Sequence, residues 1–286
     1  MLLVVLALIA FAANSVLTRL ALVETTIDPI TFTAARLASG AMVLVLIVWL
    51  RPNPPSAPTF RPWGFLLRWV APAALLGYAI LFTLAYRQLT AATGALLLFG
   101  AVQLSMLLWT VLRGERLFGL AWCGVMLALA GLVGLLLPGL QRPPLASALM
   151  MVGAGIAWAV YTLQGRLQND PTRATAINFV LAAIPISLFA LLRWVEASWD
   201  GYGLTLAVLS GAVASGLGYV IWYAALPHLK TSTAAVAQLQ VPVITALAGV
   251  LLLAEPLTIR LIMAGGVILG GIILVIAPWQ GKTARP

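Results

Sequence analysis

Long apolar segments, separated by short breaks rich in Arg, Pro, Asp and Glu, follow one another through the whole chain and leave very few folds open. Each segment holds about 20 residues, the length of an α-helix that crosses the apolar core of a bilayer. Inside a bilayer the backbone N–H and C=O groups must pair within their own segment, so a helix is the expected structure. We predict ten such helices, at 2–21, 30–50, 69–87, 93–112, 118–137, 145–165, 174–192, 203–225, 232–252 and 259–277. The predicted fold class is therefore an all-α integral membrane protein, with the lipid bilayer as its surroundings.

The composition excludes several other classes of protein. Of the 286 residues, 63% are hydrophobic and only 8% are charged, too few polar groups to cover the surface of a soluble fold. The net charge is +9, but the basic residues stand singly in the breaks, so no nucleic-acid partner is expected. Cys123 is the only cysteine, which excludes an internal disulfide and a thiolate metal site. We expect no cofactor and no metal.

Two hairpin-like stretches, Gly77 to Leu117 and Leu217 to Leu257, share residues at one constant offset without a gap. The match includes Glu115 and Glu255 (255 − 115 = 140), in a chain that has only seven acidic residues. Such internal similarity indicates a chain built from two related halves. We predict a first five-helix repeat at 1–139, a second at 145–277 and a cytoplasmic tail at 278–286.

The odd number of helices in each half decides how the two halves are oriented. A second half of five helices enters the bilayer from the side opposite to the first, which gives inverted-topology repeats. Lys and Arg collect on the face that holds both ends of the chain, whereas most acids lie on the other face. Because positive residues favour the cytoplasmic side, we predict a multi-pass protein of the cell inner membrane with both termini cytoplasmic. Glu115 and Glu255 then lie on opposite faces.

Motifs in the two halves resemble the drug/metabolite transporter superfamily, in its bacterial ten-helix, two-repeat form, the EamA type. The likeness rests on an aromatic-small-small-polar opening of each half, an arginine in the second span, matching hairpin ends and a Gln-to-Pro stretch. These are Phe11 to Ser15, Trp158 to Thr162, Arg36, Gly114-Glu115-Arg116, Ala254-Glu255-Pro256 and Gln238 to Pro242. The chain departs from the pattern at Phe11, where many relatives have Trp, and at Val102, which matches Pro242.

Within the superfamily the chain is most similar to bacterial aromatic amino acid exporters. The resemblance implies an exporter or facilitator of small metabolites, aromatic or other neutral or zwitterionic amino acids, that works by alternating access through a central cavity. Export of other metabolites or of drugs is one alternative, and a channel or a membrane scaffold without carrier activity is another. The oligomeric state stays open.

Residues that could carry enzymatic chemistry are scarce. His228 is the only histidine, and it stands alone beside Pro227 at a predicted helix end. The sequence has no His–Cys cluster, no paired carboxylates and no Gly-rich phosphate loop after a strand. We therefore predict that the chain is not an enzyme.

Ionisable residues are also rare within the predicted spans. Arg36 lies in the second span, Arg19 lies near a helix end, and no carboxylate falls deep in the membrane. Buried carboxylates are the usual proton or sodium relays of coupled transporters, so their absence favours passive transport or coupling through other groups. It also argues against a dedicated exporter of cationic drugs. For Arg36, a structural ion pair or carbonyl contact is favoured slightly over contact with a substrate carboxylate.

Aromatic and uncharged polar residues at helical spacing give the predicted binding site. Tyr78 and Phe82 fall at i and i+4 in the third span, and Tyr219 and Tyr223 do so in the eighth. An unpaired amide in lipid costs on the order of a few kcal/mol, so amides in mid-span are expected to face the protein interior. We predict substrate contacts from Asn14, Tyr78, Phe82, Trp158, Tyr161, Tyr219, Trp222, Tyr223, Gln238 and Gln240. For rings near span ends, an interfacial aromatic belt is the alternative.

Glycine and proline positions predict a support and its hinges. Glycines in the fifth and tenth spans allow helices to approach closely, with Gly266-x-x-x-Gly270 as a small-xxx-small pair. They are Gly124 and Gly131 in the fifth span, and Gly265, Gly266, Gly270 and Gly271 in the tenth. We expect spans four, five, nine and ten to form a packed support. Proline residues within spans three, seven and nine are expected to kink their helices; they are Pro72, Pro185 and Pro242.

Overall fold

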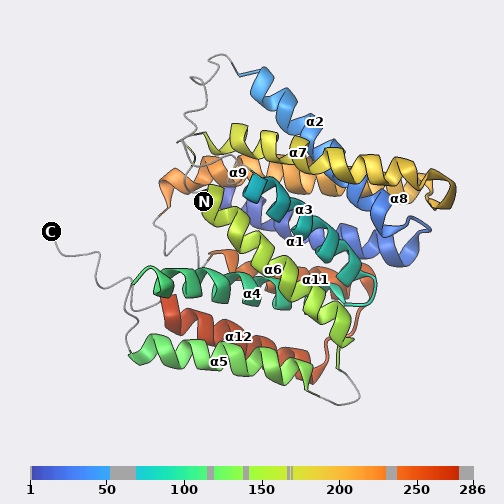
Figure 1. Cartoon of the computed structure of the whole chain (residues 1–286). Coiled ribbons are helices and arrows are strands. Elements are labelled where there is room, and N and C mark those ends of the chain that lie inside the picture. Colours follow the sequence, from blue (N-terminus) through green and yellow to red (C-terminus); the bar gives the residue numbers. More distant parts are fainter. Residues whose placement is uncertain are drawn as a thin grey trace.

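The structure of the chain is a computed structural model that describes residues 2–51, 69–114, 119–137, 142–165, 168, 170–229 and 237–276. All regular structure in these ranges is helical (Figure 1). The α-helices are α1 (Leu2–Glu24), α2 (Pro29–Trp49), α3 (Val70–Tyr86), α4 (Ala91–Leu112), α5 (Gly119–Leu136), α6 (Leu145–Gly165), α7 (Pro171–Leu192), α8 (Gly201–Val208), α9 (Gly218–Ala225), α11 (Gln240–Leu253) and α12 (Ile259–Ile276). A π-helix, η3 (Leu209–Leu217), joins α8 to α9, and short 3-10 helices lie at η2 (Trp194–Glu196) and η4 (Leu226–His228).

The predicted set of membrane-spanning helices is confirmed. In the described chain, eight helices are long and apolar enough to cross a membrane, with α8, η3, α9 and η4 counted as one span. Two shorter apolar helices, α3 and α11, complete the ten. The predicted start of the ninth span at 232, and the tail at 278–286, lie outside the described residues.

The polar breaks in the sequence become helix caps. Asp28 begins α2 by accepting hydrogen bonds from Ile30 N (2.9 Å) and Thr31 N (3.1 Å). Asp170 and Asp200 cap α7 and α8 in the same way. A carboxylate at this position pairs N–H groups that the first helical turn leaves without partners, and it interacts favourably with the helix dipole. Three of the seven acidic residues of the chain thus mark where spans begin.

Three pairs of corresponding helices, α2 with α7, α4 with α11 and α5 with α12, pack against each other and run antiparallel. At one end of α2 and α7, Arg51 forms an ion pair with Asp170 (Nη1–Oδ1 3.2 Å). At the other end, Asp28 N donates to Ser198 O at 2.9 Å. Because the start of α2 meets the end of α7 and vice versa, the two helices run in opposite directions, at the upper edge of Figure 1.

The other two pairs of corresponding helices follow the same rule. Ala91 N, in the first turn of α4, donates to Glu255 Oε2 just beyond the end of α11 (2.7 Å). α5 packs along α12 in the opposite sense, with Gly124 against Gly271 and Gly131 against Ile268. α6 packs against α3 and α4, as α1 packs against α9 and α11. The fold therefore consists of two five-helix repeats of inverted topology.

The bundle has two ends, the Glu255 end and the amino-terminal end. At the Glu255 end, α1 stops and α2 starts, and α11 stops and α12 starts. At the amino-terminal end, α1 starts and α12 stops. Glu115, which the sequence comparison pairs with Glu255, lies outside the described residues.

The support made by α5 and α12 depends on very close backbone approach. A Cβ atom on Gly271 would lie 2.5 Å from the carbonyl oxygen of Gly124, so only glycine fits there. The predicted pair Gly266 and Gly270 is wrong as the contact, because a Cβ on either would meet nothing within 4 Å. Among the four glycines predicted for close approach in the tenth span, Gly271 is confirmed as the contact.

Of the predicted kinks, only one proline lies in a helix interior. Pro185 lies within α7. Pro72 and Pro242 both fall in the first turn of their helices, α3 and α11, where a proline removes no helical hydrogen bond. For these two residues the prediction of an interior kink is wrong.

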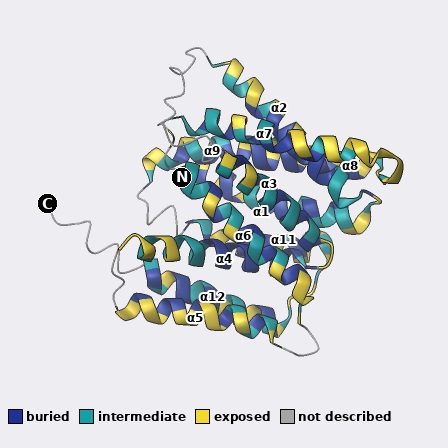
Figure 2. Cartoon of the chain, viewed as in Figure 1, coloured by how far each residue is buried: buried dark blue, intermediate teal, exposed yellow. Residues whose placement is uncertain are grey.

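Burial is arranged for a bilayer rather than for water (Figure 2). Large apolar side chains are exposed on the outer helix faces, among them Leu192, Leu251 and Ile259. The polar side chains Asn14 and Arg36 are buried in the middle of the bundle. This inverted distribution fits a protein with lipid around it and a polar site within it.

Candidate functional site

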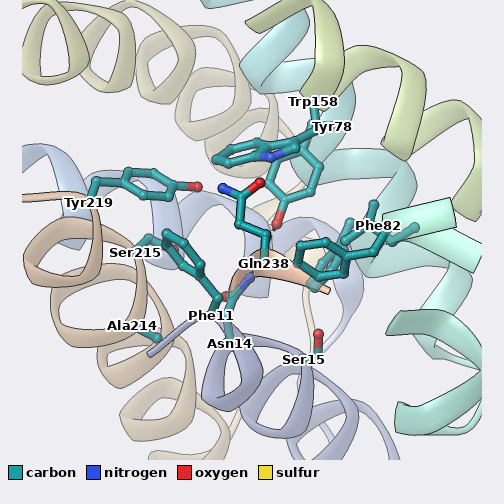
Figure 3. A pocket seen from close by; sticks show the side chains of 12 residues that line it. Phe11, Asn14, Ser15, Tyr78, Phe82, Trp158, Ala214, Ser215, Tyr219 and Gln238 are labelled. Atoms are coloured by element: carbon teal, nitrogen blue, oxygen red, sulfur yellow. Dashed lines mark hydrogen bonds between the residues drawn. The ribbon is translucent and has the colours of Figure 1, made fainter. Parts of the chain in front are cut away.

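A small pocket lies in the middle of the bundle, where α1, α3, α4, α6 and η3 converge (Figure 3). Half of its twelve lining residues are aromatic, four others carry amide or hydroxyl groups, and two are aliphatic. Its lining is Phe11, Asn14, Ser15, Tyr78, Phe82, Leu98, Phe99, Trp158, Ala214, Ser215, Tyr219 and Gln238. In Figure 3 the Gln238 amide lies in the middle of the surrounding rings. No lining residue carries a formal charge, so the pocket suits a molecule that is neutral overall.

The pocket is nearly closed in this conformation. Its volume is about 30 Å³, enough for about one water molecule. Pockets that hold metabolites measure several hundred Å³. The side chains around the pocket must therefore move apart before a solute can enter.

The aromatic wall is a continuous chain of ring contacts across the halves. Trp158 of α6 lies 4.9 Å from Tyr78 of α3 and 5.3 Å from Tyr219 of α9, measured between ring centroids. Phe11 of α1 contacts Tyr219 at 5.8 Å, and Phe82 contacts Tyr78 at 5.2 Å. Tilted ring pairs at these distances are favourable, and the same ring faces can stack on an inserted aromatic group.

A hydrogen-bond network sets the position of the Asn14 amide. Asn14 Nδ2 donates to Tyr78 Oη at 3.2 Å, and Ser210 Oγ donates to Asn14 Oδ1 at 2.7 Å. Arg36 Nη2 donates to the same Tyr78 oxygen at 3.3 Å. The network connects α1, α2, α3 and η3. A displacement of the Tyr78 side chain would therefore change hydrogen bonds to α1 and α2 directly, and to η3 through Asn14.

The π-helix η3 gives the pocket its second-half wall. Its sequence of small residues, LSGAVASGL, lets the backbone approach α2 so closely that a Cβ on Gly211 would lie 2.0 Å from Arg36 O. The wider turn places Ala214 and Ser215 at the pocket. π-helical turns are rare and often occur at functional sites.

Two serine hydroxyls at the pocket have no hydrogen-bond partner. Ser15 Oγ and Ser215 Oγ are both buried and unpaired in the described structure. An unpaired buried hydroxyl costs about 1–3 kcal/mol. A polar solute would recover this energy.

Six of the predicted site residues line this one pocket: Asn14, Tyr78, Phe82, Trp158, Tyr219 and Gln238. The sequence interpretation missed Ala214 and Ser215, because the π-helix changes which residues of the eighth span face inward. It also left out Phe11 and Ser15, although both stand beside Asn14 on α1. Their position beside Asn14 on the same helix is the signal that could have identified them as pocket residues. That any of these residues binds substrate stays a prediction.

The other four predicted site residues lie elsewhere. Tyr161 Oη donates to Thr175 Oγ1 of α7 at 3.3 Å, and the Tyr223 hydroxyl lies near Gly165, at the end of α6. Trp222 is buried against the ring of Phe11, behind the pocket. Gln240 is exposed at the first residue of α11, so the prediction that it faces inward is wrong.

Arg36 also differs from expectation. Its side chain is only 1% exposed, and neither Nε nor Nη1 has a hydrogen-bond partner. The expected structural ion pair or carbonyl contact is absent among the described residues. The guanidinium instead lies against the faces of Phe82 and Tyr78, with Cζ at 5.0 and 5.4 Å from the ring centroids.

A cluster of polar contacts closes the bundle at the Glu255 end. Arg19 Nε donates to Glu255 Oε1 at 2.8 Å, and Arg19 Nη1 donates to the carbonyl oxygens of Tyr86 (2.9 Å) and Arg87 (3.1 Å). Glu255 follows Ala254, whose left-handed backbone ends α11. The cluster ties α1, the α3–α4 turn and the end of α11 together on one side of the pocket.

A larger hollow of about 430 Å³ lies between α4, α5 and α6. Ser105 is the only lining residue with a polar side chain besides the indole of Trp122, and several others, such as Leu108 and Met126, are exposed on the outer surface. This hollow has the character of a lipid-facing crevice. Within the described ranges, no three His, Cys, Asp or Glu residues come together as metal ligands.

Comparison with known proteins gives a consistent result for both halves. The model of a family described as the EamA-like transporter family matches residues 1–137 and, separately, 145–277. The chain is 51% identical over 285 residues to the uncharacterized protein PA1977 of Pseudomonas aeruginosa, covering 100% of this chain and 97% of that protein. It is 29% identical to the uncharacterized transporter YwfM of Bacillus subtilis, over 93% of this chain and 90% of the relative.

Two further similarities concern a named exporter and a fold. The threonine/homoserine exporter RhtA of Escherichia coli is 27% identical, over 82% of this chain and 78% of RhtA. One solved structure, titled only as the crystal structure of a protein, matches with a TM-score of 0.68 at 21% identity. That match covers 96% of this chain and 95% of the other, and it bears on the fold alone.

Proposed function

The chain belongs to the EamA-like transporter family, and from that premise we propose that it carries neutral amino acids, aromatic ones foremost, across the cell inner membrane. Members of such a family are multi-pass membrane proteins that transport small molecules. The proposal concerns the substrate and the mode of transport. Its structural support is the central pocket.

One observation carries the substrate assignment. The pocket combines six aromatic rings with the amides of Asn14 and Gln238 and with two unpaired serine hydroxyls, and none of its lining residues is charged. Rings offer stacking surfaces worth roughly 1 kcal/mol each beyond burial. Amides and hydroxyls offer hydrogen bonds to ammonium and carboxylate groups. A zwitterion with an aromatic side chain matches both kinds of wall.

A second substrate class is favoured by a separate observation. The relative RhtA is named for threonine and homoserine, two small amino acids with hydroxyl groups. The orphan hydroxyls of Ser15 and Ser215 would suit such a side chain. A small pocket would also need to expand less to admit it.

The closed state of the pocket supports a carrier over an open channel. In this conformation the polar cluster around Arg19 and Glu255 seals one side. Inverted repeats provide two structurally similar ends that can open in turn. We propose alternating access, with the predicted repeats 1–139 and 145–277 as the two halves that move.

The orientation follows from charge. In the sequence, ten Lys and Arg residues fall in the breaks and the tail assigned to the amino-terminal side of the spans, against four, Arg87, Arg142, Arg193 and Arg260, on the Glu255 side, which also holds most of the acidic residues. Positive residues favour the cytoplasmic side. We propose that the amino-terminal end faces the cytoplasm and that both termini lie there.

A competition panel in proteoliposomes tests the substrate. Uptake of labelled tryptophan, and separately of labelled threonine, is measured in the presence of excess phenylalanine, tyrosine, threonine, homoserine, arginine or glutamate. The proposal expects strong competition by the aromatic amino acids and none by arginine or glutamate. Competition mainly by threonine and homoserine would favour the second class, and uptake no greater than in empty liposomes for every labelled amino acid would refute both.

A further inference from the structure

Arg36 is a buried positive charge that the described protein leaves largely unpaired. Its side chain is 1% exposed near the middle of α2. The ion pairs of the described chain are Arg19–Glu255, Arg51–Asp170 and Arg193–Glu196, and none involves Arg36. Among the described residues, its side chain makes one hydrogen bond, from Nη2 to Tyr78 Oη, at 3.3 Å.

The contacts that Arg36 does make satisfy only part of its bonding capacity. A guanidinium has five N–H donors, and the one on Nε and both on Nη1 have no partner. The ring faces of Tyr78 and Phe82 attract the charge, but they accept no conventional hydrogen bond. Buried charges in proteins are as a rule paired and hydrogen-bonded, because an unpaired one is costly. An anion from outside the chain would supply the partner that Arg36 lacks.

The position of Arg36 indicates where that anion enters. Tyr78 and Phe82 cover the guanidinium on one side and line the central pocket on the other. The Tyr78 hydroxyl is also shared with Asn14, a pocket residue. A rotation of the Tyr78 ring would both widen the pocket and expose the guanidinium to it.

We infer that Arg36 binds the carboxylate of the transported molecule when the Tyr78 ring moves aside. This inference rests on the proposed function and narrows it to solutes that carry a carboxylate. The ammonium group of an amino acid would then face the ring walls and the oxygens of Ser15 and Gln238. In the closed state the two rings take the place of the anion over the guanidinium, so the emptied carrier can return without a fixed counter-ion.

One positive charge in an otherwise uncharged pocket selects among solutes. A carboxylate neutralises this charge. An amino acid zwitterion does so with its carboxylate, and its ammonium group can then interact with the faces of the aromatic rings. A purely cationic amine meets repulsion. A carboxamide keeps the shape but loses the charge, so comparison of an acid with its amide isolates the contribution of Arg36.

The first arm of the test uses the unmodified protein. Competition against labelled tryptophan is compared for phenylalanine, phenylalaninamide and phenethylamine in proteoliposomes. Hydrogen bonds to a charged partner are strong enough that the acid is expected to compete at least tenfold better than the amide. Equal competition by acid and amide overturns the inference, and no variant needs to fold for this result.

The second arm compares Arg36→Gln with Arg36→Lys and the matched control Arg260→Gln. Arg260 is a partly buried arginine that donates to the Gly134 and Leu137 carbonyl oxygens, away from the pocket. The acid-to-amide preference should fall towards one in Arg36→Gln, persist in part in Arg36→Lys and stay unchanged in Arg260→Gln. An unchanged preference in folded Arg36→Gln overturns the inference.

A third arm separates this inference from the proposed function. If no amino acid is transported, thermal stabilisation of the detergent-solubilised protein is measured with sodium benzoate, benzamide and sodium chloride. Stabilisation by benzoate over benzamide that disappears in Arg36→Gln supports the carboxylate site although the amino acid assignment fails. Equal stabilisation by chloride and benzoate, or none by either, overturns it.

Discussion

The Arg19–Glu255 ion pair offers a quantitative test of how the pocket is closed. In Glu255→Gln the side chain keeps its shape but loses its charge, while Arg19 keeps its two carbonyl partners on the α3–α4 turn. The carboxylate accepts two close hydrogen bonds, from Arg19 Nε at 2.8 Å and from Ala91 N at 2.7 Å. The change therefore weakens the connection between α1, α4 and α11 without removing the side chain.

The magnitude follows from the contacts. Charge-assisted hydrogen bonds contribute about 1.5–3 kcal/mol each. The two side chains are 16% and 12% exposed, so solvent screens them in part. With the hydrogen bonds weakened rather than lost, we expect the closed state to lose about 2 kcal/mol, which changes the ratio of open to closed forms about 30-fold.

The assay measures access to the pocket from the Glu255 face. Ser15, which lines the pocket and is buried, is replaced by Cys in a Cys123→Ala background. A membrane-impermeant maleimide is applied from that face, and labelling should be about 30-fold faster after Glu255→Gln. Glu196→Gln is the matched control, because its ion pair with Arg193 is highly exposed and contributes little. Equal labelling rates in the two variants would refute the assignment of the pair to closure.

Other predictions follow from the same contacts. Gly271→Leu should cost about 1–3 kcal/mol of stability, seen as a lower melting temperature in detergent, because its Cβ meets the α5 backbone, whereas Gly270→Leu should be tolerated. Trp158→Ala should raise the half-saturation concentration for tryptophan tenfold or more through loss of a stacking face, while Trp194→Ala, at an exposed position, should not. The backbone N–H of Gly203 holds the pKa of the Asp200 carboxyl below its usual range, so its stabilisation persists above about pH 4 and is lost as the pH falls through the lowered pKa. A melting curve of Asp200→Asn should lack that acid-dependent loss. Because the described spans contain no carboxylate in mid-membrane, net flux should run down a substrate gradient without an imposed proton or sodium gradient. Strict dependence of flux on either ion gradient would contradict this.

The sequence predicted the spans well for a physical reason. Apolar length and polar breaks act locally, and the same Asp28, Asp170 and Asp200 that interrupt the apolar runs cap the helices that follow them. Inversion of the halves was predictable from the odd number of spans. Which of the four glycines of the tenth span contacts Gly124 was not, because the rotation of a helix about its axis depends on its neighbour.

The pocket was predictable only in part. Spacing of i and i+4 correctly grouped Tyr78 with Phe82, since both lie on a regular α-helix. The same spacing failed for Tyr219 and Tyr223, of which only Tyr219 lines the pocket. The unpaired state of Arg36 could not be read from the chain, because it depends on which helices surround α2.

Counterflow in proteoliposomes is the measurement that tests the central claim most directly. Liposomes containing the protein are preloaded with unlabelled tryptophan and diluted into a trace of labelled tryptophan. A carrier with one site open to alternate sides predicts transient accumulation of label above its external concentration, reduced in Trp158→Ala at the same tryptophan concentrations. Label that rises only to equilibrium, with no overshoot and no dependence on the preloaded solute, would contradict alternating access through this pocket.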